Sequence, residues 1–328
     1  MPNKVTVSVK GLRKEYTRYQ KRTGFKGFFR DIVHPQIETV QALQEISFEL
    51  RQGEILGLIG PNGAGKTTTL KILSGVLYPD GGQVVVLGQL PQKRTQSFLR
   101  SISFFTGNRG FLQEATWDLS VLDGFIYVKD IYGIPNKVFQ RKLDELTDLL
   151  QIKDLLRVPL RQLSHGQRVR AELVGALLWD PELLLLDEPT IGIDIVSQQA
   201  VWNFVKAYVS KHQTSTILTS HYIRDLEELA DRLLILNEGV IVYDGPPSRF
   251  ISEISPFSLI KVKFEQIIDA GQLIGYELID FTPMEAIFRT PTTQVKKTVK
   301  KILDNLQITD ISIEEPDLEI VLKEYFTK

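Results

Sequence analysis

The segment Gly60–Thr67 limits what this chain can fold into more than any other part of its sequence. It matches the pattern G-x-x-x-x-G-K-[ST] and follows an apolar run, Glu54–Gly60, that is typical of a buried strand. Glycines at these positions allow successive backbone N–H groups to curl around phosphate oxygens, and the start of the following helix adds its dipole. The plain alternative, a glycine turn beside a surface lysine, is disfavoured because it leaves the buried strand unexplained.

Each residue type in this segment has a chemical reason to be there. Lys66 is placed to reach the β- and γ-phosphates of a nucleotide, and the hydroxyl of Thr67 is placed to bind Mg²⁺. Backbone groups of the loop and of the first helical turn supply the remaining phosphate contacts. The predicted nucleotide-binding residues of this segment are Asn62, Gly63, Ala64, Gly65, Lys66, Thr67 and Thr68.

A second apolar run, Leu183–Leu186, ends in two acidic residues, Asp187 and Glu188. A carboxylate at such a point can hold Mg²⁺ through water, and the next carboxylate can polarise an attacking water molecule. Taken alone, two acids after a strand are more often a helix cap or a solvated turn. Beside a phosphate-binding loop the functional interpretation is favoured, with Asp187 as a metal residue and Glu188 as a general base.

Strands alternate with helices along most of the chain, which predicts an α/β fold with a parallel core. Helical periodicity dominates from about residue 95 to 180, and we expect a helical subdomain at about 98–178. After Gly245 the pattern changes to alternating strands and one helical stripe. We therefore expect a nucleotide-binding domain over residues 1–250 and a small α+β accessory or dimerisation domain over residues 251–328.

Composition excludes several classes of protein. The 328 residues include 39 basic and 40 acidic side chains, and the net charge of -1 removes the simple electrostatic case for a nucleic-acid binder. Cysteine is absent, which excludes disulfides, thiolate metal sites and cysteine nucleophiles. No apolar run reaches the roughly 20 residues that cross a bilayer, and the N-terminus has no signal pattern. We expect a chain that neither spans a membrane nor binds nucleic acid.

The sequence LSHGQ at Leu163–Gln167 narrows the class. Together with the phosphate loop it resembles the ABC ATPases, the nucleotide-binding subunits of ABC transporters, whose signature is LSGGQ; here His165 replaces the first glycine. Three other motifs occur in the family's order. The segment EPTIGID at Glu188–Asp194 resembles the D-loop, and His221 in LTSHYIRD has the place of the switch histidine. Near the N-terminus, Tyr16 in LRKEYTR has the place of the adenine-stacking aromatic. The resemblance covers residues 5 to about 245. It implies the P-loop NTPase fold of an ABC ATPase core with a helical subdomain.

The resemblance also implies a role for each matched residue. Tyr16 offers a π-face to adenine. Lys66 stabilises charge, Glu188 is the general base, and His221 senses the γ-phosphate. In the family the signature of one subunit faces the ATP that is bound to a second subunit. The residues implied for that contact are Ser164, Gly166, Gln167 and Asp194. Plainer interpretations stay open: an ordinary surface or core tyrosine, a helix cap in the signature and a structural histidine.

One family feature has no clear match. ABC ATPases carry a glutamine, after the strand that follows the phosphate-loop helix, which contacts Mg²⁺ and faces the membrane partner. The region here reads SISFFTGNRGFLQEATWDLSV. Asn108 is the most natural equivalent and is expected as a metal residue beside Thr67 and Asp187, with Gln113 as the other candidate. Asparagine has the same amide but is one methylene shorter.

These features predict an ATP-binding and ATP-hydrolysing subunit that uses Mg²⁺ and works as a homodimer or heterodimer against membrane-spanning partner subunits. Its expected place is peripheral, on the cytoplasmic face of the membrane. The tail Ile313–Phe326 resembles that of ATPases that serve ABC-2-type exporters, which favours export. The alternative is a soluble ABC ATPase on ribosomes or DNA; the single cassette and the lack of sustained heptads disfavour it. A non-hydrolysing regulator is disfavoured because the expected catalytic residues are present.

Residues 17–41 add length between two expected strands, 5–9 and 46–50, that many ABC ATPases join more directly. Five apolar side chains between Phe25 and Val33 recur at helical spacing, with basic residues around them. A basic amphipathic helix of this kind suits a membrane interface. The alternative is that its apolar face packs on the protein's own core.

Overall fold

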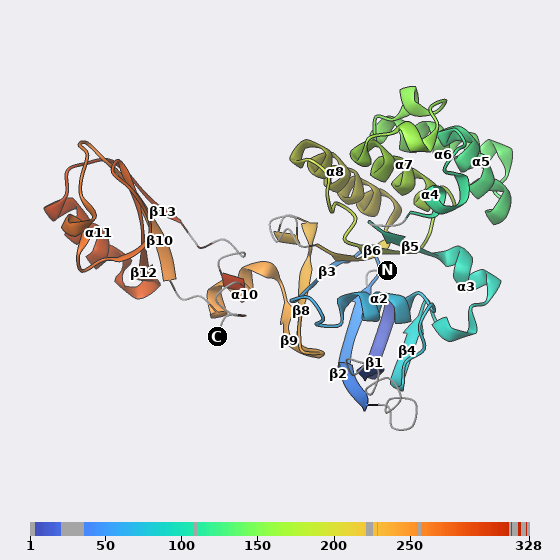
Figure 1. Ribbon diagram of the computed structural model, residues 1–328, viewed down its shortest axis with the longest axis horizontal. Helices are drawn as coiled ribbons and strands as arrows, with labels where there is room; N and C mark the ends of the chain where they lie inside the picture. The colour runs from blue at the N-terminus through green and yellow to red at the C-terminus, as the bar shows by residue number, and fades with distance from the viewer. Residues whose placement is uncertain are drawn as a thin grey trace, which may run out of the picture. The chain divides into compact units, whose positions relative to one another are not determined.

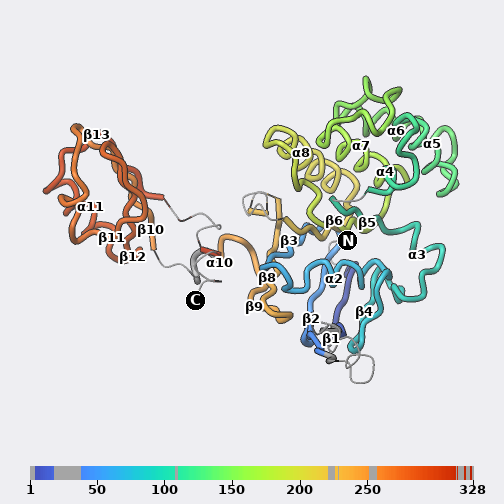
Figure 2. Tube along the Cα trace, in the orientation of Figure 1, coloured from blue at the N-terminus to red at the C-terminus, as the bar shows by residue number. Residues whose placement is uncertain are grey.

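A computed structural model describes residues 4–20, 36–107, 110–220, 226–227, 229–254, 257–314, 316, 321–322 and 326 of the chain. The chain divides into two compact units, Met1–Asp244 and Gly245–Lys328 (Figures 1 and 2). Among the helices of this described part, none is long and apolar enough to cross a bilayer. The phosphate loop, the acidic strand and the signature all lie in the first unit, which is therefore described first.

The first unit is built on a six-stranded sheet with the order β5-β6-β7-β3-β8-β9. Five of its strands run parallel to their neighbours, which confirms the predicted parallel core. Every residue of β3, β6 and β7 is buried, as is usual for central parallel strands with both faces covered. The strands are β3 (Ile55–Ile59), β5 (Ile102–Thr106), β6 (Leu183–Asp187), β7 (Ser215–Thr219), β8 (Arg232–Asn237) and β9 (Val240–Gly245).

A second sheet is antiparallel and has the order β2-β1-β4. It consists of β1 (Val5–Gln20), β2 (Gln36–Arg51) and β4 (Gly81–Val86). The helix that follows the phosphate loop, α2 (Lys66–Leu73), contacts both sheets through β2 and β6 (Figure 1). Its buried side chains therefore join the two sheets in one apolar core, which fixes the loop in front of the helix.

The β1–β2 hairpin is longer than the expected strands 5–9 and 46–50. Residues 17–20 and 36–41 continue its two strands and pair with each other as far as Gln20 opposite Gln36. The register shifts at several places between Val5 and Glu15, and such bulges break the alternation of apolar and polar residues by which a strand is detected in sequence. The segment that contains the expected amphipathic helix, Phe25–Val33, lies outside the described residues.

Helices dominate the stretch between β5 and β6, and they lie together in Figure 1. One part of the expected helical span 98–178 is different, because Ile102–Thr106 forms the edge strand β5 of the main sheet. The helices of this unit are α3 (Gln96–Ser101), α4 (Phe111–Thr116), α5 (Val121–Tyr132), α6 (Asn136–Leu149), α7 (His165–Leu177) and α8 (Ile195–His212), with 3₁₀ turns η1 (Pro91–Lys93), η2 (Lys153–Leu155) and η3 (Leu160–Gln162).

The second unit has its own antiparallel sheet, of order β11-β12-β10-β13, and its own apolar core. Residues of β10 and β12 and the buried Ile302 of α11 form that core, as the alternation and the helical stripe in the sequence indicated. The expected last helix, at 317–325, falls largely outside the described residues. The elements are α10 (Pro247–Ile254), β10 (Phe257–Phe264), η4 (Ala270–Leu273), β11 (Glu277–Thr282), β12 (Glu285–Pro291), η5 (Thr292–Gln294), α11 (Val295–Asn305) and β13 (Ile308–Glu314).

Candidate nucleotide-binding and catalytic site

The phosphate loop lies between the carboxyl end of β3 and the start of α2. Gly65 is the N-cap of α2 and has a φ of 105°, a conformation that side chains with a Cβ rarely adopt. A Cβ on Gly65 would lie 2.6 Å from the carbonyl oxygen of Ala42 on β2. The loop is thus pressed against β2, and the first turn of α2 keeps its backbone N–H groups, with no side-chain cap, for a ligand.

Lys66 is folded back over this loop. Its side chain is buried, and Nζ donates hydrogen bonds to the carbonyl oxygens of Gly60 at 2.6 Å and Pro61 at 3.1 Å. Burial lowers the pKa of Lys66, whereas the carboxylates of Glu188 and Asp187 raise it. An ammonium group held by two carbonyl oxygens and facing two acids is a fixed positive charge at the place where a polyphosphate would bind.

Two hydroxyls converge on the carboxylate of Asp187. The Thr67 Oγ1 donates to Asp187 Oδ1 at 3.2 Å, and Thr219 Oγ1 donates to the same oxygen at 2.9 Å. Hydroxyl and carboxylate oxygens are the donors that Mg²⁺ prefers, and Mg²⁺ usually keeps several waters while it binds to one or two protein groups. The residues present therefore fit a Mg²⁺ site made by Thr67 and Asp187.

Glu188, the next residue, has a φ of 52°, which is uncommon outside glycine. Its N–H donates to both the carbonyl oxygen and the hydroxyl of Thr219, at 3.2 and 3.0 Å. Such backbone conformations persist where the surrounding structure imposes them, and they cluster at functional sites. Thr219 thus orients both acids. Sequence analysis missed it, although a threonine two residues before His221 at the end of a buried strand was a detectable signal.

A cavity of about 310 Å³ is lined by Lys66, Thr67 and Glu188 among these groups. Glu188 and the loop residues form one end of it, and Tyr16 and Val40, opposite each other on β1 and β2, form the other. The Tyr16 ring is 41% exposed, and its hydroxyl lies 3.2 Å from Thr68 Oγ1. The phosphate-binding end and an aromatic surface for a base thus occur in one cavity. Its lining residues are Tyr16, Val40, Ala42, Asn62, Gly63, Ala64, Gly65, Lys66, Thr67, Thr68 and Glu188.

The signature forms the start of α7. Ser164 is its N-cap: Ser164 Oγ accepts a hydrogen bond from the N–H of Gln167 at 3.2 Å, and the Gln167 side chain accepts one from the N–H of Ser164 at 2.9 Å. The helix-cap interpretation is therefore correct in the single chain. Gly166 is confined, because a Cβ there would lie 2.9 Å from Ser197 Oγ.

Asp194 is the N-cap of α8 and accepts hydrogen bonds from the N–H and the hydroxyl of Ser197, which lower its pKa. It stands beside Gly166, since a Cβ on that glycine would lie 3.8 Å from Asp194 Oδ2. Among the described residues, neither the signature nor Asp194 lines the cavity of the phosphate loop. The structure thus brings together the loop, the acids and Tyr16, and it places the signature residues and Asp194 elsewhere in the unit.

Two predicted site residues, Asn108 and His221, lie outside the described residues, and their roles stay predictions. Gln113, the other glutamine-loop candidate, is the third residue of α4. Its N–H donates to Glu172 Oε1 on α7 at 2.6 Å, and the N–H of Leu112 donates to Glu172 Oε2 at 3.0 Å. Glu172, which sequence analysis did not single out, is buried, and burial raises its pKa to about 7 against these two hydrogen bonds.

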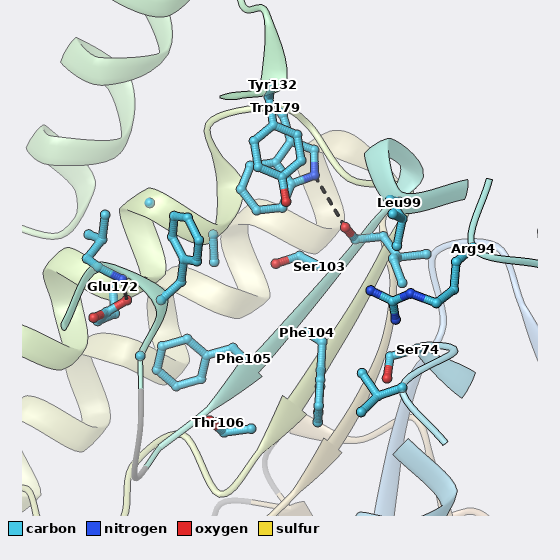
Figure 3. A pocket seen from close by; sticks show the side chains of 17 residues that line it. Ser74, Arg94, Leu99, Ser103, Phe104, Phe105, Thr106, Tyr132, Glu172 and Trp179 are labelled. Atoms are coloured by element: carbon cyan, nitrogen blue, oxygen red, sulfur yellow. Dashed lines mark hydrogen bonds between the residues drawn. The ribbon is translucent and has the colours of Figure 1, made fainter. Parts of the chain in front are cut away.

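A second cavity, of about 300 Å³, lies beside this contact (Figure 3). It opens between the edge strand β5 and the helices α4, α5 and α7, and its lining is mostly apolar, with Arg94 and Glu172 as charged groups. The rings of Tyr132 and Trp179 stack at 3.9 Å, and Trp179 Nε1 donates to the carbonyl oxygen of Ile102 at 3.3 Å. This cavity is thus walled by the strand and helix that flank residues 107–110.

The sequence matches two family models. The model of the ABC transporter matches residues 43–191, and that of the C-terminal domain of EvrA-like ABC transporters matches residues 256–314. The chain is 32% identical, over 63% of its length, to the "Doxorubicin resistance ATP-binding protein DrrA" of Mycobacterium tuberculosis, and it spans 61% of that relative's length. It is 31% identical to the "Nod factor export ATP-binding protein I" of Rhizobium sp. (strain N33), over 63% of this chain and 67% of the relative.

Solved structures agree on the fold. The cassette MJ0796, described as a dimer in a post-hydrolysis state bound to ADP and Pi, superposes with a TM-score of 0.58 at 20% identity, over 73% of this chain and 98% of the other. At that identity the likeness establishes the P-loop NTPase fold of an ABC cassette. Taken with the matched motifs and the export relatives, it shows that the chain belongs to the family of ABC transporter ATP-binding proteins.

Proposed function

We propose that this chain is the ATP-binding and ATP-hydrolysing subunit of an ABC-2-type exporter. The observation that carries the proposal is one cavity lined by Lys66, Thr67 and Glu188, with Tyr16 also in its lining. Asp187 accepts a hydrogen bond from Thr67 at this site. A cation, a metal-binding pair, a carboxylate base and a flat ring are the groups that an ATP hydrolase needs. The relatives named for doxorubicin resistance and for Nod factor export support the assignment to export.

The proposed chemistry follows from the position of each group. The N–H groups of the loop and Lys66 bind the β- and γ-phosphates, and Tyr16 stacks on adenine. Mg²⁺, held by Thr67 and Asp187, would neutralise phosphate charge when bound. Glu188 accepts a proton from water as the water oxygen bonds to the γ-phosphorus and the bond to the bridging oxygen breaks, so that ADP and phosphate leave. His221 is proposed to contact the γ-phosphate.

We propose that two subunits close on two ATP molecules. The phosphate cavity of this chain is not lined by Ser164, Gly166, Gln167 or Asp194. This supports the proposal that their ligand is the ATP of a second subunit. The capped start of α7 presents a hydroxyl and helix N–H groups that suit a γ-phosphate. The solved cassette that is described as a dimer supports dimerisation.

The proposed contact with membrane-spanning subunits is the cavity of Figure 3. Its lining includes Thr106 and Gly110–Leu112, in the region where the family places the glutamine that faces the membrane partner. The helices beside it expose apolar side chains: Phe111 is 50% exposed and stacks on Tyr127 at 5.9 Å, and Ile131 is 49% exposed. Such a face suits a peripheral protein on the cytoplasmic side of a membrane. Detergent co-purification with a polytopic membrane protein tests this contact.

The test of the catalytic proposal is the change Glu188→Gln. The amide keeps size and hydrogen bonding but cannot accept the proton of water, so we expect ATP binding to persist and turnover to fall by about 10²–10⁴-fold. The variant should accumulate as an ATP-bound dimer, which gel filtration with labelled ATP measures.

The matched control is Glu182→Gln, the same chemical change one residue before the other end of β6. Glu182 is exposed and forms an ion pair with Lys4 at 3.9 Å, away from the phosphate cavity, so turnover should stay close to that of the unchanged protein. Near-normal hydrolysis by the Glu188 variant, with the control also active, would remove Glu188 from the role of base.

A further inference from the structure

His165 stands where the family has the first glycine of its signature, and its side chain makes a contact that glycine cannot make. The imidazole is exposed, and its Nε2 lies 2.9 Å from the carbonyl oxygen of Ile191, which belongs to the segment Glu188–Asp194 between β6 and α8. A carbonyl oxygen only accepts hydrogen bonds, so Nε2 is the nitrogen that carries the hydrogen. The contact therefore ties the start of α7 to the residues that follow the general base.

The same residue of that segment is also bonded to Glu188. The N–H of Ile191 donates to the carbonyl oxygen of Glu188 at 3.3 Å. Glu188 is held in its left-handed conformation by Thr219 on one side and by this turn on the other. A short path thus leads from His165, through the two peptide groups of Ile191, to the backbone of the proposed base.

The imidazole of His165 also lies next to the residue that follows Ile191. Gly192, with a φ of 73°, follows Ile191, and a Cβ on it would lie 3.5 Å from His165 Cδ2 and Nε2. The imidazole therefore rests against the chain at Gly192 while it donates to the preceding carbonyl. A shift of the signature relative to this segment would have to break the hydrogen bond or move the segment with it.

We propose that His165 is a positioning residue that couples the two ATP sites of the dimer. The proposal rests on the proposed function, because only in a closed dimer do the signature and Glu188 of one chain serve different nucleotides. When the signature engages the γ-phosphate held by the partner, His165 carries the displacement to Ile191, and Glu188 is set for its own site. His165 touches no reacting atom in this scheme and affects turnover through Glu188.

The cap of α7 does not use the His165 side chain, so its replacement should leave the fold intact. The reciprocal bonds are made by Ser164 and Gln167, and the imidazole fills no core. We expect the melting temperature of the full-length chain to change by no more than about 2 °C on substitution. This separates a positioning role from a merely structural one.

The experiment compares His165→Leu with His165→Gln in steady-state ATP hydrolysis by the full-length chain over a range of ATP concentrations. Glutamine keeps a nitrogen donor near the place of Nε2, whereas leucine has similar bulk and no donor. Loss of one such hydrogen bond should lower the kcat of His165→Leu by about five-fold, with KM changed by less than about two-fold. Its Hill coefficient for ATP should fall toward one, and His165→Gln should retain both kcat and cooperativity.

Three results would overturn the proposal: unchanged kcat and Hill coefficient in His165→Leu, an equal loss in His165→Gln, or a clear fall in melting temperature that accounts for the lost turnover. Failure of the proposed function would look different. In that case the unchanged chain would hydrolyse no ATP or would be indifferent to Glu188→Gln, and the coupling role would be rejected with it. Turnover that depends on Glu188 and not on His165 counts against His165 alone.

Discussion

Gly65 shows how closely single residues define the phosphate loop. Its φ of 105° and the 2.6 Å that would separate a Cβ from Ala42 O leave no room for a methyl group. We predict that Gly65→Ala lowers the free energy of unfolding by at least about 1–2 kcal/mol, the usual cost of a left-handed backbone conformation for a residue with a Cβ. The loop must also move away from β2, so ATP affinity should fall. Urea unfolding and ATP titration measure the two effects.

Gly63→Ala is the control for this change. Gly63 also has a positive φ, 85°, but no atom lies within 4 Å of the place where its Cβ would be. It should therefore incur the backbone cost alone and destabilise the protein less than Gly65→Ala. Equal losses of stability in the two variants would show that the contact between the Ala42 carbonyl oxygen and a Cβ at position 65 does not contribute to the destabilisation.

At this scale the sequence predicts what a short continuous motif contains. Two short motifs identify Lys66, Thr67, Asp187 and Glu188, because each motif lies at the carboxyl end of a buried strand. Parallel strands bring their carboxyl ends to one edge of the sheet. Thr219 and Glu172 are different. Their importance arises from hydrogen bonds to residues 32 and 59–60 positions away, and no local pattern records such partners.

Among the elements, α7 and α4 are joined by a group that titrates. Burial raises the pKa of Glu172 from 4.5 to about 7, so the fold favours the protonated carboxyl. The contribution of the protonated Glu172 carboxyl to the free energy of unfolding is fully present below pH 4.5 and is lost as the pH rises through about 7. Glu172→Gln keeps the uncharged form at every pH. We predict that it becomes more stable relative to the unchanged chain between pH 5 and pH 8, by up to roughly 3 kcal/mol.

Chemical denaturation at the two pH values measures this difference. Glu182→Gln, the same chemical change at an exposed position outside this contact, is the matched control and should shift stability equally at both. A constant difference between Glu172→Gln and the unchanged chain would mean that the two backbone N–H groups hold the carboxylate ionised throughout this range.

Helices can be predicted from the sequence where the apolar periodicity is unbroken, as in α6, whose buried Phe139, Leu143 and Leu146 recur at helical spacing. The full length of the β1–β2 hairpin and the edge strand β5 cannot be predicted in this way. Bulges interrupt the alternation of β1, and β5 has only five residues inside a stretch of helices. Their pairing with distant strands stabilises them, so their existence depends on tertiary contacts that periodicity does not encode.

For the whole molecule, the division into Met1–Asp244 and Gly245–Lys328 suggests that the first unit can stand alone. The described residues of its phosphate cavity all precede Gly245, and each unit has a separate apolar core. We predict that a chain ending after about residue 248 folds, with a cooperative thermal transition, and binds ATP with nearly the affinity of the full-length protein. A fragment that folds cooperatively but does not bind ATP would place part of the nucleotide site in the second unit.

The way α7 is capped determines which letters of its motif are free to change. Ser164 and Gln167 are tied to each other, and Gly166 is held small by Ser197. The side chain of His165, the remaining residue of the four, takes no part in the cap. In a library randomised at residues 164–167 and selected for folding alone, many residue types should be accepted at position 165 and few at positions 164, 166 and 167. If the same library is selected for transport, we expect fewer residue types to be accepted at position 165 as well. Selection for folding would thus constrain Ser164, Gly166 and Gln167, whereas selection for transport would constrain His165 as well.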